Sequence, residues 1–282
     1  MSKTVAVIGA GGKMGARAAE KIGFGHPFRV LLCESNRERA QALEDKGLRV
    51  TETSEAMAGA DFVVMAVPDA LIGTIARDLV PAMKPGATLI MLDAAAAYIG
   101  GLPVRDGITQ IITHPCHPPF FTEQETPEAR RDYFGGTAVQ DIIVSLISGW
   151  EESFAEGVEL CRALFAPVRR ALRVTPEQFA FLEPAMSEII VAAAANWMKQ
   201  SMEAAIEKGV PREAAEAFMA GHAQIAMAIV FGAEPSPFSD AAKLAIAWGT
   251  EKYINPEWRQ VYERETLARA IEDILKPRAV TA

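Results

Sequence analysis

Short apolar runs alternate with helical patterns through the first half of the chain. The apolar runs are Thr4–Ile8, Arg29–Cys33, Arg49–Thr51, Phe62–Val67, Thr88–Asp93 and Thr109–Thr113. Helical periodicity lies between them, near Met14–Ile22, Arg37–Lys46 and Asp69–Val80. Continuous apolar runs are typical of parallel strands that are covered on both faces. The alternation therefore predicts βαβ units that build a doubly wound parallel sheet.

The second half of the chain is dominated by helical patterns. Residues Pro176 to Lys208 predict one long helix that is kinked near Pro184 and ended by Gly209. Further helices are predicted from Pro211 to Gly232, after Ser236–Asp240, and from Asn255-Pro256. The segment 136–174 has a strand–helix–strand pattern that completes the first half. We therefore predict an α/β fold: a Rossmann domain over residues 1–174 and an all-α domain over residues 175–282.

Composition narrows the class of partner. The chain has 282 residues, a length consistent with about two domains, and 28 basic against 36 acidic residues, a net charge of −8. This charge argues against a broad nucleic-acid surface, although one local pocket could still bind an anionic substrate. No uninterrupted apolar run reaches the ~18 residues of a membrane span. With three scattered cysteines and no signal-peptide pattern, we expect a soluble protein of the reducing cytoplasm.

The first chemical motif is a glycine-rich turn directly after the first predicted strand. Glycines at this place allow a tight turn and let the backbone approach a pyrophosphate at a helix N-terminus. The spacing departs from G-x-G-x-x-G, because position 14 is Met and the last glycine comes one residue late. The residues predicted to bind the dinucleotide here are Gly9, Gly11, Gly12, Lys13, Met14 and Gly15.

An acidic residue supplies the second part of the dinucleotide signature. Glu34 ends the second predicted strand, where a carboxylate would bind the adenosine ribose and repel a 2′-phosphate, so NAD is favoured over NADP. Arg37 nearby could instead bind that phosphate, or it could be a solvated residue of the next helix. Val67 and Pro68, after the fourth predicted strand, are expected to line the nicotinamide side.

A histidine pair follows the last strand of this alternation. His114 comes at the carboxyl end of that strand, where ligands of open α/β sheets bind, and His117 follows in a loop rich in proline. The pattern is compatible with a structural loop. It is also compatible with a metal ligand or acid–base group that faces the nicotinamide, with His114 preferred, His117 second and Cys116 as a bystander.

The predicted long helix contributes a carboxylate in apolar surroundings. Glu183 lies within Phe179–Met186, and burying a carboxylate there is costly without a metal or substrate as partner. Asn196, Lys199, His222 and Asp240 are further polar residues of the helical half whose roles the sequence leaves open.

These motifs resemble a known family. The turn Gly12-Lys13-Met14-Gly15 is similar to the start of the β-hydroxyacid and 6-phosphogluconate dehydrogenase superfamily, and also to that of prephenate dehydrogenases. Thr113–Pro118, Phe181–Pro184 and Pro237–Asp240 resemble proteins with a phosphogluconate-dehydrogenase-type C-terminal domain, among them the D-apionate oxidoisomerase family. Classical superfamily members carry Lys and, four residues later, Asn on the interdomain helix. Here Asn196 precedes Lys199, so no catalytic lysine is carried over.

The resemblance implies an NAD-dependent enzyme acting on a small anionic hydroxy acid. It implies that NAD oxidises the 2-hydroxyl of a branched sugar acid. A divalent metal held by His114 and Glu183, zinc by preference, would then assist a 1,2-shift. It also implies a homodimer that forms through the helical domain.

Two other functions remain compatible with the sequence. One is a metal-free NAD(P)-dependent dehydrogenase of a 3-hydroxyacid or prephenate-like substrate, with His114 as the general base. The other is a non-catalytic NAD-binding sensor or scaffold.

Overall fold

The computed structural model describes residues 2–23 and 26–276, which divide into two compact units. Unit 1 contains the chain up to Glu183 together with the end of the last helix from Ile271 on, and unit 2 is Pro184–Ala270.

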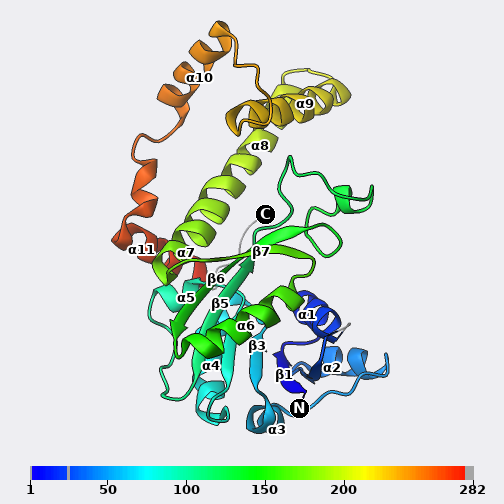
Figure 1. The fold of residues 1–282 in the computed structure, drawn as a ribbon. Helices are drawn as coiled ribbons and strands as arrows, with labels where there is room; N and C mark the ends of the chain where they lie inside the picture. The colour runs from blue at the N-terminus through cyan, green and yellow to red at the C-terminus, as the bar shows by residue number, and fades with distance from the viewer. Residues whose placement is uncertain (1, 24–25, 277–282) are drawn as a thin grey trace. The chain divides into compact units, whose positions relative to one another are not determined.

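Unit 1 is built on one seven-stranded sheet with the order β2-β1-β3-β4-β5-β6-β7 (Figure 1). Strands β1 to β5 are parallel, β6 is antiparallel to β5, and β7 is parallel to β6. The strand order reverses at β1, because β2 and β3 lie on opposite sides of it, and such reversals create the ligand crevice of open α/β sheets. The strands are β1 (Lys3–Ile8), β2 (Phe28–Cys33), β3 (Phe62–Met65), β4 (Thr88–Met91), β5 (Thr109–Pro115), β6 (Gln140–Ser148) and β7 (Val168–Arg173).

Helices cover both faces of this sheet. Alternate residues of β1 belong to two separate buried clusters: Val5 and Val7 pack on one face, Ala6 and Ile8 on the other. The first face is covered by α1 (Lys13–Gly23), α2 (Arg37–Glu44) and α6 (Glu151–Leu164). The second is covered by α3 (Thr53–Gly59), α4 (Asp69–Ala82), α5 (Ala95–Tyr98) and α7 (Pro176–Ala180). The predicted doubly wound α/β fold with a helical C-terminal region is therefore confirmed.

The C-terminal region is helical throughout its described elements. After α7 the helix continues with π geometry over η2 (Phe181–Ala192) and then as α8 (Ala193–Glu207). Pro184 lies inside the π segment; its ring lacks an N–H and clashes with the carbonyl of a regular preceding turn, so widened turns relieve that conflict. The remaining helices are α9 (Arg212–Val230), α10 (Asp240–Tyr253), the 3₁₀ turn η3 (Trp258–Tyr262) and α11 (Arg264–Leu275).

Two predicted elements are different in the structure. The strand predicted over Arg49–Thr51 is reduced to a single bridge between Leu32 and Val50. The helix predicted from Asn255-Pro256 begins at Arg264, because Asn255 Oδ1 accepts from Glu257 N and a 3₁₀ turn follows. Both segments are short, so their contacts in the folded protein, and not the periodicity of the sequence, determined their secondary structure.

One helix in the described part of the chain, Pro176–Glu207, is long and apolar enough to cross a membrane by length and composition alone. Helices that pack within proteins pass the same test. We expected no membrane span because no uninterrupted apolar run is long enough. That criterion is stricter than one based on helix length and mean hydropathy.

Candidate active site

The glycine-rich turn brings the ends of the first three strands together. Gly9 has a φ of +78°, and a Cβ there would lie 2.5 Å from the Ala66 carbonyl oxygen at the end of β3. The amides of Gly9 and Ala10 both donate to the Cys33 carbonyl at the end of β2. A Cβ on Gly15 would clash with the Gly9 carbonyl, so this late glycine lets α1 pack against the turn. Gly15 thus has the packing role of the last glycine in the dinucleotide signature.

Glu34 closes the adenosine end of the predicted cofactor site. Its Oε2 accepts from Gly11 N and its Oε1 from Asn36 N, both at 2.9 Å. A cavity of about 420 Å³ opens beside it, and four of the predicted cofactor residues line it: Gly9, Glu34, Val67 and Pro68. The arginine among its lining residues is Arg39, whereas sequence reasoning had singled out Arg37. Only the fold of α2 decides which of these side chains faces the cavity.

The side chains of Lys13 and Met14 point to different surroundings. Lys13 Nζ lies 4.3 Å from the centre of the Phe134 ring, and Met14 packs against the core under α1 and α6. Any contribution of Met14 to the cofactor therefore comes from its backbone. The cofactor roles of the glycine-loop residues remain predictions.

His114 and Glu183 meet at the carboxyl ends of β4 and β5. His114 Nδ1 lies 3.0 Å from the Leu92 carbonyl and 3.2 Å from Glu183 Oε1. Glu183 Oε2 accepts from Ala94 N at 3.0 Å. The Glu183 side chain is only 6% exposed, so the apolar surroundings seen in the sequence correspond to real burial. Two residues predicted independently are thus in contact.

Burial sets the charge of the groups around this pair. It lowers the pKa of His114, and the hydrogen bond to the Leu92 carbonyl opposes that shift only in part. Desolvation, together with the charge of the nearby Asp93, raises the pKa of Asp69 to about 6. Sequence reasoning missed these two acids. The available signal was their place shortly after strands β3 and β4, which end at Met65 and Met91.

The His114–Glu183 pair is compatible with a metal in its donor types and spacing. His114 Nδ1 and Glu183 Oε1, 3.2 Å apart, could share a metal about 2.1 Å from each, provided that Nδ1 gives up its hydrogen bond to the Leu92 carbonyl and the proton that this bond requires. An imidazole nitrogen with a carboxylate oxygen suits zinc. Within residues 2–23 and 26–276, no three His, Cys, Asp or Glu side chains converge as a metal-binding group. A metal here would thus have two protein side chains as ligands and several open positions.

The loop after β5 places a second imidazole beside His114. The His117 ring centre lies 6.1 Å from that of His114, with the ring planes at 85°. His117 Nδ1 lies 2.9 Å from the Phe134 carbonyl. Desolvation raises the pKa of Cys116 to about 11, which keeps it a neutral thiol.

Two of the polar residues singled out in unit 2, His222 and Asp240, have local partners. His222 Nδ1 lies 2.9 Å from the Phe218 carbonyl, and the two rings stack at 3.8 Å. Asp240 pairs with Lys243, and Ser239 caps α10 by accepting from Ala242 N. These contacts are those of ordinary helix caps and helix surfaces.

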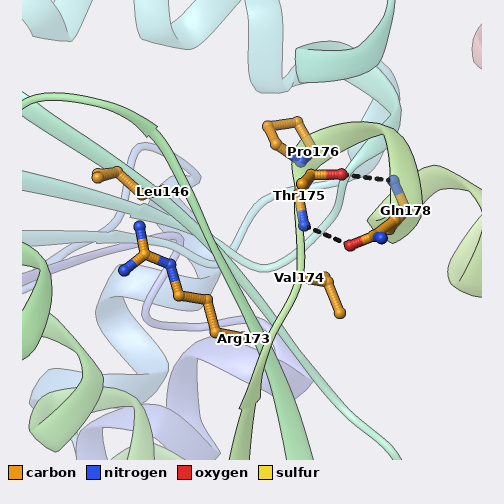
Figure 2. Close-up of a pocket in the computed structure, with 6 residues that line it drawn as sticks. All are labelled: Leu146, Arg173, Val174, Thr175, Pro176 and Gln178. Carbon is orange, nitrogen blue, oxygen red and sulfur yellow. Dashed lines mark hydrogen bonds between the residues drawn. The ribbon is translucent and has the colours of Figure 1, made fainter.

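A smaller cavity of about 250 Å³ lies where β7 leads into α7 (Figure 2). Thr175 and Gln178 form a reciprocal capping box there: Gln178 N donates to Thr175 Oγ1, and Thr175 N donates to Gln178 Oε1. None of its six lining residues belongs to the predicted site. We therefore assign this cavity to the structure of the strand-to-helix junction.

A glycine-rich turn after β1, an acid after β2 and, at the end of β5, a half-buried histidine in contact with a buried carboxylate define a Rossmann-type dinucleotide-binding oxidoreductase. Residues 122–275 match the phosphogluconate dehydrogenase (decarboxylating) C-terminal family. Residues 1–144 match the NADPH-binding domain of acetohydroxy acid isomeroreductase. The particular family follows from curated relatives. D-apionate oxidoisomerases of Cupriavidus necator and Blautia hydrogenotrophica are each 40% identical to this chain over 97% of its length, covering 100% and 96% of the relatives. The chain belongs to this family.

Solved structures agree with this assignment. An NAD-binding protein of Cupriavidus necator, described as a semialdehyde dehydrogenase in complex with calcium and NAD, has a TM-score of 0.93 at 40% identity. The match covers 97% of this chain and 100% of the chain in that structure. An oxidoreductase described from Jannaschia has a TM-score of 0.90 at 38% identity, covering 98% and 100%. The predictions of family and of an NAD-dependent oxidoreductase are confirmed at family level; the predicted metal stays a prediction.

Proposed function

We propose that this protein oxidises D-apionate, or a closely related branched sugar acid, with NAD and couples the oxidation to isomerisation of the carbon chain. Membership in the D-apionate oxidoisomerase family supports the substrate class. The observation that carries the proposal is the contact between the half-buried His114 and the buried Glu183 at the carboxyl edge of the sheet.

Oxidation requires that a hydride reach the nicotinamide and that the hydroxyl lose its proton. The cavity beside Glu34 supports binding of the adenosine end of NAD, which would direct the nicotinamide toward the ends of β3 and β4. The substrate hydroxyl would then lie near His114. The product of this step is a keto group beside a tertiary alcohol, which is the arrangement that a 1,2-shift requires.

In the main candidate mechanism, His114 and Glu183 would hold a divalent metal, zinc by preference. When bound, such a metal supplies Lewis-acid polarisation of the keto and hydroxyl oxygens. The role of Glu183 is to hold its carboxylate in place: the Ala94 amide fixes Oε2, so Oε1 stays directed at His114.

One observation favours a second, metal-free mechanism. A carbonyl oxygen can only accept a hydrogen bond, so contact with Leu92 implies that Nδ1 of His114 carries the proton. Nε2 then keeps its lone pair and can take the hydroxyl proton as a general base. In this mechanism Glu183 orients the imidazole and stabilises the imidazolium that forms.

The test is an assay of the purified protein with D-apionate and NAD, reading both the reduced cofactor and the carbon skeleton of the product. We expect His114→Ala to lower kcat/KM by at least about 100-fold and Glu183→Gln to lower it by a smaller factor. His26→Ala, at a surface loop, is the matched control. Loss of activity with a chelator and recovery with zinc would support the first mechanism; full activity without metal would support the second. Reduced cofactor with an unrearranged product would remove isomerisation from the proposal.

We also propose a cytoplasmic homodimer that forms through the helical domain. Helices α8 and α10 contain no buried residue among those described. Large apolar side chains of the same unit are exposed, among them Trp197, Phe218 and Trp248. A second copy of the chain would cover them.

A further inference from the structure

His117 has a backbone conformation that few residues other than glycine adopt. Its φ is +58°, and in the described part of the chain it is the one non-glycine residue with a positive φ. Such conformations persist where the surroundings determine them, and they concentrate at functional sites. Pro115 and Pro118 stiffen the chain on either side. The loop thus holds this imidazole in one place at a conformational cost.

The hydrogen bond of His117 determines which of its nitrogens faces a ligand. Nδ1 lies 2.9 Å from the Phe134 carbonyl, which can only accept, so Nδ1 carries the proton. In the neutral imidazole, Nε2 is then a hydrogen-bond acceptor. Since the ring centre is 6.1 Å from that of His114, a small molecule held at His114 is within reach of His117.

Phe134 ties this imidazole to the cofactor helix α1. Its ring lies 5.2 Å from the His117 ring, and the cations of Lys13 and Arg17 lie 4.3 and 4.9 Å from its centre. Arg17 also donates to the Gly135 carbonyl.

The loop around Phe134 is braced from two further sides. Lys21 Nζ donates to the Gly136 carbonyl at 2.6 Å. The Asp132 carboxylate accepts from three backbone amides, those of Gly135, Thr137 and Ala138. The Phe134 carbonyl that aligns His117 is therefore a fixed acceptor.

We propose that His117 determines substrate specificity by accepting a hydrogen bond from one hydroxyl group of the substrate, and that Phe134 is the residue that positions it. A neutral acceptor recognises a hydroxyl, whereas a carboxylate would need a donor. Polyhydroxy acids carry several hydroxyls besides the one that is oxidised. This inference rests on the proposed function and specifies how its substrate class is recognised.

The experiment combines the substitution of one residue of the protein with the removal of one hydroxyl group of the substrate, as in a double-mutant cycle. The full-length protein is assayed with D-apionate and with deoxy analogues that each lack one hydroxyl but keep the oxidised one. We expect the wild type to lose about tenfold in kcat/KM with one analogue. His117→Asn should show no such discrimination, because Asn tolerates a positive φ but does not present the imidazole acceptor. Phe134→Leu should reduce the same discrimination in part, while Phe120→Ala, an exposed aromatic in the same loop, should keep it.

The outcomes separate this inference from the proposed function. If the wild type does not reduce NAD with D-apionate, the proposed function fails and the inference fails with it. If the wild type is active but His117→Asn lowers kcat/KM equally for D-apionate and every analogue, the inference alone is overturned. It is also overturned if His117→Asn instead removes discrimination between the acid and its carboxamide.

Discussion

At the scale of single residues, the cofactor end of the site depends on how the two oxygens of Glu34 are held. Each accepts one backbone amide, from Gly11 and from Asn36. The side chain of glutamine has only one acceptor oxygen in place of the two carboxylate oxygens. It also lacks the negative charge that repels a 2′-phosphate.

We therefore expect Glu34→Gln to weaken NAD binding by about tenfold and to narrow the preference for NAD over NADP. Titration of the protein with each dinucleotide measures both effects. Glu38→Gln, on the exposed side of α2, is the control. A wild type that prefers NADP would contradict the role of Glu34 and would direct attention to Arg39, which lines the same cavity.

Residue types alone revealed part of the site. The glycines were recognisable because the backbone of the turn requires them, and the acid and the histidine because ligands of open α/β sheets bind at the carboxyl ends of strands. The sequence did not show that Arg39, and not Arg37, lines the cavity, because this depends on the rotation of α2 about its axis. Asp69 and Asp93 were missed because neither lies in a distinctive motif.

At the scale of secondary-structure elements, the last two strands are joined by a charged cluster. Asp141 of β6 accepts from the side chains of Arg169 and Arg170 of β7 and from the Arg170 backbone amide. These arginines hold the pKa of Asp141 far below its usual range. A carboxyl whose pKa is lowered by folding stabilises the fold above its unfolded pKa of about 3.9, and this stabilisation is lost as the pH falls below that value.

We expect Asp141→Asn to lower the free energy of unfolding by about 1–2 kcal/mol at pH 7, a modest value because solvent screens the half-exposed arginines. The difference from wild type should shrink below about pH 4, where Asp141 takes up a proton in the unfolded chain while it stays ionised in the folded protein. Denaturant titrations at several pH values measure it. Glu151→Gln, which breaks an exposed pair with Arg173, should change stability far less. A difference independent of pH would contradict the electrostatic explanation.

The periodicity of the chain predicted most elements because buried parallel strands and amphipathic helices leave strong local signals. In the segment Arg49–Thr51, Val50 forms one isolated β-bridge, to Leu32. The local preference for extended backbone therefore did not become a strand. The π geometry after α7 was foreseen only as a kink at Pro184. The sequence pattern alone does not distinguish a bent α-helix from a helix with widened turns.

At the scale of the whole molecule, the helical domain leaves large apolar side chains without cover. Trp197 and Trp248 are 48% and 56% exposed. Apolar surface of this kind usually marks an interface.

We expect sedimentation to give a species of twice the 30.4 kDa of one chain. Trp248→Lys should shift it toward monomer while NAD binding persists, because the glycine turn and Glu34 belong to unit 1. Val104→Lys, at an exposed apolar residue of unit 1, should leave the mass unchanged. A monomeric wild type at assay concentration would contradict the proposed dimer.

The sequence by itself determined the doubly wound sheet, the helical C-terminal region, the glycine turn and the family, because all of these arise from local periodicity or from contiguous motifs. Only the tertiary structure decided that Glu183 contacts His114, since 69 positions separate them and packing of α7 on the sheet brings them together. It also decided the direction of the His117 imidazole, which depends on a carbonyl 17 residues away. Long-range contacts of this kind follow from the packing of the whole core, and no local pattern encodes them.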